Sequence, residues 1–175
     1  MITGVTIRTA VLGDRDHILD IVRDAFSSQD RDAQEELDIV LSTWALEATP
    51  HELELVAVAE GTIVGHVLAA RGDLDGREVV GVAPLAVMPS RQGLGIGSAL
   101  MNELLRRADE VPLPLLVLLG RPAYYGRFGF EPSGPLGISY QAVGAGNPHF
   151  QVRRCAGYDP SYRGSFTYCW EAPRP

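Results

Sequence analysis

The chain has 175 residues, of which 46% are apolar and 21% charged, and its formal net charge is −7. This composition is typical of a folded protein, and the length favours a single domain over residues 1–175 rather than two small ones. The acidic balance argues against a nucleic-acid partner, which needs a basic surface, and no apolar run reaches the roughly 20 residues that cross a bilayer. We therefore expect neither a nucleic-acid partner nor a membrane partner.

The N-terminal residues and the two cysteines indicate the cellular compartment of the protein. Residues 1–14 lack the basic segment, apolar core and cleavage site of a secretory signal, so we expect a cytoplasmic protein. Cys155 and Cys169 stand in no metal-ligand or redox spacing, and we expect two reduced thiols and no metal site.

The N-terminal segment predicts a strand followed by two helices. Residues 5–9 alternate apolar and polar side chains, as a strand does. Asp14 is a suitable N-cap for a helix that extends to Phe26, and apolar residues recur on one face of a second helix over residues 33–46. The polar residues 27–32 between them predict a loop.

The middle of the chain predicts a hairpin, a central strand and a helix. Residues 53–59 and 63–70 are strand-like runs joined by a short polar connection, which suits a hairpin. After a second turn, residues 79–87 are almost wholly apolar, as in a strand covered on both faces. From Gly97 to Ala108 the apolar residues follow a helical period.

The last third predicts short elements between turns. Residues 115–119 form a buried strand, and residues 122–127 form a short helix with a proline at its start. Residues 131–148 are rich in Gly and Pro, and we expect closing strands over residues 150–155 and 165–170. The alternation of strands and helices indicates an α/β fold.

The turn between the central strand and the helix carries chemical information. Residues 91–98 read Arg, Gln, Gly, Leu, Gly, Ile, Gly, Ser. The first turn of a helix presents backbone N–H groups and the positive end of the helix dipole, and glycines allow the backbone to approach an anion closely. A P-loop is excluded because the chain contains no Lys, and a dinucleotide fingerprint would need a third Gly at Ser98. A phosphate cradle and a glycine-rich turn without a ligand both remain open.

These residues resemble the GNAT family of acetyl-CoA-dependent N-acetyltransferases, whose motif is matched by Gln92, Gly95 and Gly97. A second match follows in residues 120–130, where Tyr125 stands five positions before Phe130. The form of this segment is similar to the YhbS-like branch of the family. The resemblance extends over nearly the whole chain. It implies an α/β (α+β) fold with a mixed, mainly antiparallel sheet of about six or seven strands and about four flanking helices.

The resemblance also implies where acetyl-CoA is held. Backbone groups of residues 85–87 would run along the pantetheine arm, and residues 92–98 would supply N–H groups to the pyrophosphate. Pro84 lacks an N–H and suits a local opening of the strand. The positions assigned to the cofactor are Leu85, Ala86, Val87, Arg91, Gln92, Gly93, Leu94, Gly95, Ile96, Gly97, Ser98, Tyr124 and Tyr125.

The implied reaction is direct attack of an amine on the acetyl thioester. The Leu85 amide would stabilise the oxyanion, and Tyr125 would protonate the departing thiolate. The sequence does not identify the base that takes the proton of the amine, because Gly81 occupies the position of a carboxylate found in some relatives. Glu78 and His66 are candidates that act through water, although a strand histidine is more often structural.

Two function classes follow from the sequence. The first is an N-acetyltransferase that acts on a small-molecule or peptide amine, as a monomer or homodimer. The second, suggested by the missing carboxylate, is a catalytically silent acyl-CoA-binding or regulatory domain. Residues 26–32 and 131–149 would line the acceptor, because loops on a rigid scaffold often carry specificity. They do not identify the acceptor.

Overall fold

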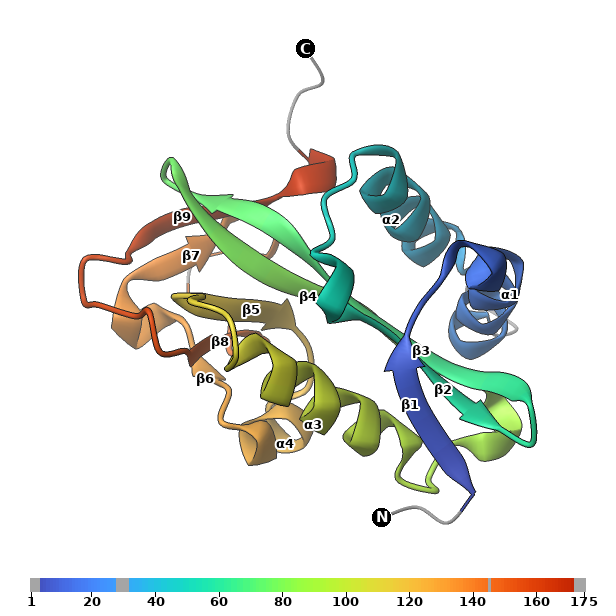
Figure 1. Ribbon diagram of the computed structural model, residues 1–175. Helices are drawn as coiled ribbons and strands as arrows, with labels where there is room; N and C mark the ends of the chain where they lie inside the picture. Colours follow the sequence, from blue (N-terminus) through green and yellow to red (C-terminus); the bar gives the residue numbers. More distant parts are fainter. Residues whose placement is uncertain (1–3, 28–31, 145, 172–175) are drawn as a thin grey trace. The chain divides into compact units, whose positions relative to one another are not determined.

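The computed structural model describes residues 4–27, 32–144 and 146–171 (Figure 1). These residues form two compact units, one within residues 1–69 and 83–107 and the other within residues 70–82 and 108–175. Among the helices in the described ranges, none is both long and apolar enough to cross a bilayer.

The first unit contains an antiparallel sheet. Strand β1 (Val5–Thr9) pairs with β2 (Glu54–Ala59), and β2 pairs with the first part of β3 (Thr62–Leu74). The last part of β4 (Arg77–Val87) follows β3 in the strand order. β2 and the first part of β3 are buried almost throughout, as the apolar runs in the sequence predict.

Helices cover both faces of this sheet. Figure 1 shows α1 (Arg15–Phe26) beside α2 (Gln34–Ala45) on one side of β2 and β3, and α3 (Ile96–Ala108) on the other. Each helix turns one apolar stripe inward, which confirms the helical periods seen in the sequence. The buried apolar side chains of these stripes are Ile18, Ile21 and Val22 on α1, Leu37 and Val40 on α2, and Leu100, Met101 and Leu104 on α3.

Asp14 lies at the predicted N-cap of α1, but its side chain does not cap that helix. Its Oδ2 instead accepts a hydrogen bond from the Val11 N–H at 2.8 Å, and Arg8 donates to both carboxylate oxygens at 2.6 and 2.9 Å. The carboxylate therefore closes the turn between β1 and α1. The charged Arg8 side chain binds the Asp14 carboxylate in place of the amides of the helix. The residue pattern of a helix cap does not show that such a partner is nearby.

The second unit has a mixed sheet built from short strands. The last part of β3 pairs antiparallel with β9 (Gly164–Tyr168), and β9 pairs parallel with β7 (Ile138–Tyr140). β4, which follows β3 in the strand order, pairs parallel with β5 (Leu115–Leu119). In this pairing Val80 lies opposite Leu116 and Gly81 lies opposite Val117. β8 (Phe150–Arg154) then pairs antiparallel with β5 and with β6 (Glu131–Pro132). The fourth helix, α4, spans Pro122–Tyr125.

The expected fold class is confirmed, because the described residues form four helices and a mainly antiparallel mixed sheet. The described sheet has nine strands, and the extra ones, β6 and β7, are two and three residues long. They lie in the Gly- and Pro-rich segment, where no alternation marks them. The single domain over residues 1–175 stays a prediction.

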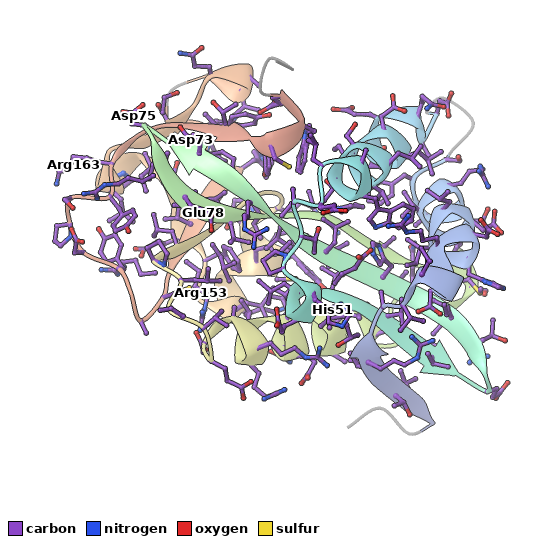
Figure 2. All side chains as sticks on the ribbon, turned by 45° about the horizontal axis from the view of Figure 1, so that its top comes forward. His51, Asp73, Asp75, Glu78, Arg153 and Arg163 are labelled. Carbon is purple, nitrogen blue, oxygen red and sulfur yellow. The ribbon has the colours of Figure 1, made fainter. Side chains whose placement is uncertain are left out.

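The hairpin between β3 and β4 is tighter than the sequence indicates. Its turn is only Asp75 and Gly76, whose φ angles are 47° and 83°. Figure 2 shows Asp73 and Asp75 at this end of the hairpin, where the Asp73 Oδ1 accepts a hydrogen bond from the Gly76 N–H at 2.9 Å. A two-residue turn with two positive φ angles matches strand twist, so both strands extend to the tip.

Candidate functional site

The glycine-rich turn of the first unit runs from the end of β4 into α3. A 3-10 turn, Pro89–Arg91, follows the strand, and the Gln92 side chain then donates from Nε2 to the Val87 carbonyl at 3.1 Å. Gly93 and Gly95 have φ angles of 75° and 87°. Other residues are strained in this left-handed region, so the path of the turn requires these glycines.

The turn leads into the first turn of α3. The Ala99 N–H donates to the Gly95 carbonyl at 3.0 Å, which closes the first helical turn. Amides before this point cannot pair inside the helix in the i to i−4 pattern, and the helix dipole adds partial positive charge there. Residues 92–95 are exposed, so the backbone here can receive an anion from solvent.

Close packing against β3 fixes the position of α3. A Cβ atom at Gly65 would lie 3.0 Å from the Leu100 Cδ1 and 3.2 Å from the Ile96 Cγ2. Ile96 and Leu100 are themselves buried. Gly65 therefore lets the first turns of α3 lie against the sheet, and the glycine-rich turn has a rigid support.

The end of β4 presents its backbone alternately to two sides. The Met88 N–H donates to the Val64 carbonyl of β3 at 3.0 Å, and the Ala86 carbonyl lies 3.3 Å from a Cβ placed at Gly65. Since successive residues of a strand alternate, the N–H of Leu85 points away from β3. This direction suits the oxyanion donor that the sequence assigns to Leu85.

The other assigned positions of this unit have different surroundings. Leu85 and Val87 are half-buried and Ala86 is buried. The Arg91 guanidinium lies 3.8 Å from a carboxylate oxygen of the exposed Glu60. Such an exposed ion pair is weak, so Arg91 can turn to a phosphate at little cost.

Tyr125 ends α4 in the second unit, where its ring lies over Gly120. A Cβ atom at Gly120 would be 2.2 Å from the Tyr125 Cε2, so only glycine leaves room for the ring. Phe130 packs edge-on against the same ring, at 6.1 Å between centroids. Burial, and the neighbouring Tyr124, raise the pKa of Tyr125 to about 12, although Arg121 opposes the shift. The phenol is therefore protonated at neutral pH and can donate a proton.

Tyr124 belongs to an aromatic cluster at the same helix. The Arg127 guanidinium lies 4.2 Å from the centre of the Tyr124 ring and 4.9 Å from that of Phe128. Tyr124 also packs edge-on against Tyr125, at 4.8 Å. The cluster holds the tyrosine pair in place by packing and cation–π contact.

Sequence reasoning missed Tyr168, which lies over Gly81. A Cβ atom at Gly81 would be 2.4 Å from the Tyr168 Cε1, so the ring fills the space that a side chain would need. Burial raises the pKa of Tyr168 far above its usual range, and Tyr140, Glu171 and Tyr125 add to the shift. Tyr168 therefore lies within electrostatic reach of Tyr125. The sequence offered one signal, a glycine inside an otherwise apolar strand.

The two candidate bases have opposite surroundings. Glu78, labelled in Figure 2, is exposed on β4. Its carboxylate lies 3.4 Å from the Arg71 guanidinium. His66 is fully buried on β3, and its Nε2 lies 3.1 Å from the Glu54 Oε1.

The two loops expected to line the acceptor, residues 26–32 and 131–149, are described only in part. Residues 28–31 of the first loop and residue 145 of the second lie outside the described residues. Within the described ranges, no group of three or more His, Cys, Asp or Glu side chains is arranged to hold a metal ion.

Known proteins resemble the chain in sequence. Over 101 residues it is 37% identical to the uncharacterized N-acetyltransferase YjhQ of Escherichia coli (strain K12), a match covering 55% of this chain and 56% of that protein. Over 74 residues it is 40% identical to the uncharacterized N-acetyltransferase YhbS of the same strain, covering 41% and 44%. The chain thus spans about half the length of the curated relatives it matches.

Solved structures share the fold over nearly the whole chain. The Escherichia coli GNAT family N-acetyltransferase YhbS in complex with CoA has a TM-score of 0.81 at 29% identity, covering 94% of this chain and 89% of that one. A GNAT family acetyltransferase from Brucella melitensis in complex with acetyl-CoA has a TM-score of 0.76 at 30% identity, covering 94% and 95%. A sequence model of the Acetyltransferase (GNAT) family matches residues 15–130. By this match, which includes both the glycine-rich turn and Tyr125, the chain belongs to the GNAT acetyltransferase family.

Proposed function

We propose that the protein is an N-acetyltransferase that transfers the acetyl group of acetyl-CoA to an amine acceptor. The observation that carries the proposal is the turn before α3, where Gly93 and Gly95 have positive φ angles at the start of a helix. The two structural relatives over 94% of this chain are complexes with CoA and acetyl-CoA, which supports the same ligand here.

The residues of the turn fit a pyrophosphate. Glycines with positive φ let successive N–H groups converge on an anion, and the helix end adds favourable charge without a basic side chain. Residues 92–98 would hold the pyrophosphate, and the backbone of residues 85–87 would run along the pantetheine arm. Arg91 would add a charge, and Tyr124 would support the ring of Tyr125.

Two groups of the chain would carry the chemistry. Bound acetyl-CoA supplies a thioester that an amine can attack. The Leu85 N–H, directed away from β3, would donate to the oxygen that gains negative charge. The Tyr125 phenol would give its proton to the sulfur of the leaving group, and its pKa of about 12 keeps that proton in place at neutral pH.

Calorimetry and thiol release test the proposal. We expect saturable binding of acetyl-CoA to the full chain, and release of free thiol when a panel of small-molecule and peptide amines is added. Absence of binding at about 1 mM acetyl-CoA, where even a weak site of roughly −4 kcal/mol would fill, would contradict the proposal.

The catalytically silent acyl-CoA-binding domain is a second candidate. It is favoured by Gly81, which offers no carboxylate and whose side-chain space is filled by Tyr168. Such a domain would bind acetyl-CoA in calorimetry and release no thiol with any amine. A cytoplasmic location and a monomeric or homodimeric state complete the proposal.

The variant Tyr125→Phe tests the proton donor. We expect kcat to fall by about 100-fold or more, because the ring still packs but can no longer donate a proton. The affinity for acetyl-CoA should stay the same in calorimetry. Tyr158→Phe is the control and should keep kcat, because it removes the same hydroxyl from a half-buried tyrosine that has no assigned part in binding or catalysis. Equal rates for Tyr125→Phe and the unmodified chain would remove Tyr125 from the mechanism.

A further inference from the structure

A buried histidine and a carboxylate form a pair on the face of the sheet opposite α3. In the register of β2 with β3, Glu54 lies opposite Leu68 and Val56 lies opposite His66. Glu54 and His66 are therefore diagonal neighbours on one face. The His66 Nε2 lies 3.1 Å from the Glu54 Oε1, and the Trp44 Nε1 of α2 donates to the same oxygen at 2.9 Å.

The carboxylate is ionised at neutral pH. Burial alone would raise the pKa of Glu54, but hydrogen bonds from His66 and Trp44, together with the charges of His66 and Arg15, outweigh burial and lower it. The Arg15 guanidinium of α1 lies 4.7 Å from the centre of the Trp44 ring. Charges and donors from three surrounding elements thus hold Glu54 as an anion.

An ionised Glu54 determines which ring nitrogen of His66 carries hydrogen. A carboxylate can only accept, so Nε2 must donate to it. In a neutral imidazole this leaves Nδ1 with a lone pair. Nδ1 is buried, and within the described residues no hydrogen-bond partner reaches it. A buried acceptor without a partner costs stability, so its retention points to a use.

His66 lies beside the stretch of β4 proposed to hold the thioester. The hydrogen bond from the Met88 N–H to the Val64 carbonyl pairs β3 with the end of β4, and His66 and Ala86 each lie two residues from that bond on their own strands. The carbonyl of Ala86 is also close to Gly65, the residue before His66. His66 is thus the titratable side chain next to residues 85–87 on β3, and residues 79–87 of β4 contain none.

We propose that His66 Nδ1 is the proton acceptor for the amine, through one bridging water, and that Glu54 is its positioning residue. The inference rests on the proposed acetyl transfer. One N–H bond of the acceptor breaks with its electron pair left on nitrogen, the water passes a proton on, and a new N–H bond forms at Nδ1. The resulting imidazolium is balanced by Glu54. The proton then leaves to solvent, which restores the neutral ring.

The groups that set the charge of the pair come from every element packed around it. They are Glu54 on β2 and Arg15 on α1, and α2 contributes the Trp44 donor.

The variant His66→Gln separates the base from the structural bond. A glutamine amide can still donate to Glu54 from the place of Nε2, but it offers no basic nitrogen. We expect kcat/KM at neutral pH to fall by about 100-fold or more. Glu54→Gln should also lower kcat/KM, because the imidazolium loses its counter-charge. His51→Gln is the control: it makes the same change at an exposed histidine and should keep kcat/KM.

A measurement without turnover keeps the inference testable by itself. Nitrogen NMR of histidine-labelled protein should show neutral His66 with hydrogen on Nε2 and a bare Nδ1. Hydrogen on Nδ1 in the neutral ring would overturn the inference, as would a His66→Gln variant with unchanged kcat/KM. Failure of the proposed function is distinct, because it shows as loss of acetyl-CoA binding in calorimetry whatever the state of His66.

Discussion

Two glycines in the second unit make room for tyrosine rings. Gly120 lies beneath Tyr125 and Gly81 beneath Tyr168, and a Cβ atom at either would come within 2.4 Å of a ring carbon. Protein interiors are packed too closely to absorb such an overlap without moving the ring or the backbone. The orientation of each tyrosine ring therefore depends on a glycine at another position in the chain, which has no side chain to displace the ring.

Gly120→Ala should displace the proposed proton donor. We expect a loss of stability of about 1–3 kcal/mol from the overlap, and a fall of kcat close to that of Tyr125→Phe, because the phenol leaves its position. Chemical denaturation and steady-state kinetics measure the two effects.

Gly126→Ala is the matched control for this change. Gly126 has φ −57° and ψ −31°, which suit alanine, and a Cβ there meets nothing within 4 Å. Its stability and kcat should stay close to those of the unmodified chain. If Gly120→Ala behaved like Gly126→Ala, the position of the Tyr125 ring would not matter for catalysis.

The start of α3 shows how one element becomes a binding site. The turn needs left-handed backbone at Gly93 and Gly95, and the helix behind it is held against β3 at Gly65. Neither feature supplies a charged side chain. At the element scale, the proposed affinity for phosphate thus comes from backbone direction and rigidity.

Gly95→Ala should weaken acetyl-CoA binding more than it weakens the fold. At a φ of 87°, alanine costs about 1 kcal/mol in stability, and relief of the strain would turn N–H groups away from the ligand. Gly76→Ala, at a φ of 83° in the hairpin tip, carries similar strain and should leave the affinity unchanged. Calorimetry with acetyl-CoA compares the two, and equal affinities for both variants would refute the cradle.

The turn between β1 and α1 should make stability depend on acidic pH. The hydrogen bond from Arg8 lowers the pKa of Asp14; burial opposes the shift, and the Val11 N–H and the charges of Arg8 and His17 support it. The unfolded chain therefore binds this proton more readily than the folded chain. Stability from Asp14 is complete above the unfolded pKa of about 3.9, and it is lost as pH falls through the folded pKa.

Asp14→Asn tests this dependence. We expect the variant to lose about 1–3 kcal/mol at neutral pH and to show a shallower further loss between neutral and acidic pH, measured by urea denaturation. Asp20→Asn is the control, since its ion pair with Arg23 is exposed and should contribute little. An unchanged acid slope in Asp14→Asn would contradict this account.

At the scale of the whole molecule, β3 and β4 are continuous through both compact units. Melting of one unit should therefore disrupt strands of the other. We expect a single cooperative transition, with far-UV and near-UV circular dichroism changing together in urea. Two separated transitions would contradict the proposed single domain.

Local patterns predicted most elements of this fold. The periods of α1, α2 and α3 and the apolar run of β5 are each complete within about a dozen residues, so the sequence shows them directly. Local patterns did not reveal the hairpin tip at Asp75 and Gly76, because its backbone geometry determines it. They also did not reveal the two shortest strands, β6 and β7, because pairing with distant strands determines them. For the same reason Asp14 looked like a helix cap, although Arg8 and Val11 bind its carboxylate.

The sequence by itself determined the proposed cofactor turn and its donor chemistry. A strand, a glycine-rich turn and a helix are adjacent in the chain, and a backbone site needs no distant partner. Only the tertiary structure decided that Tyr168 lies over Gly81 and that His66 meets Glu54. These contacts join residues on different strands, and their register depends on how the whole sheet pairs. No local period records that information, so these contacts come into view only in the folded chain.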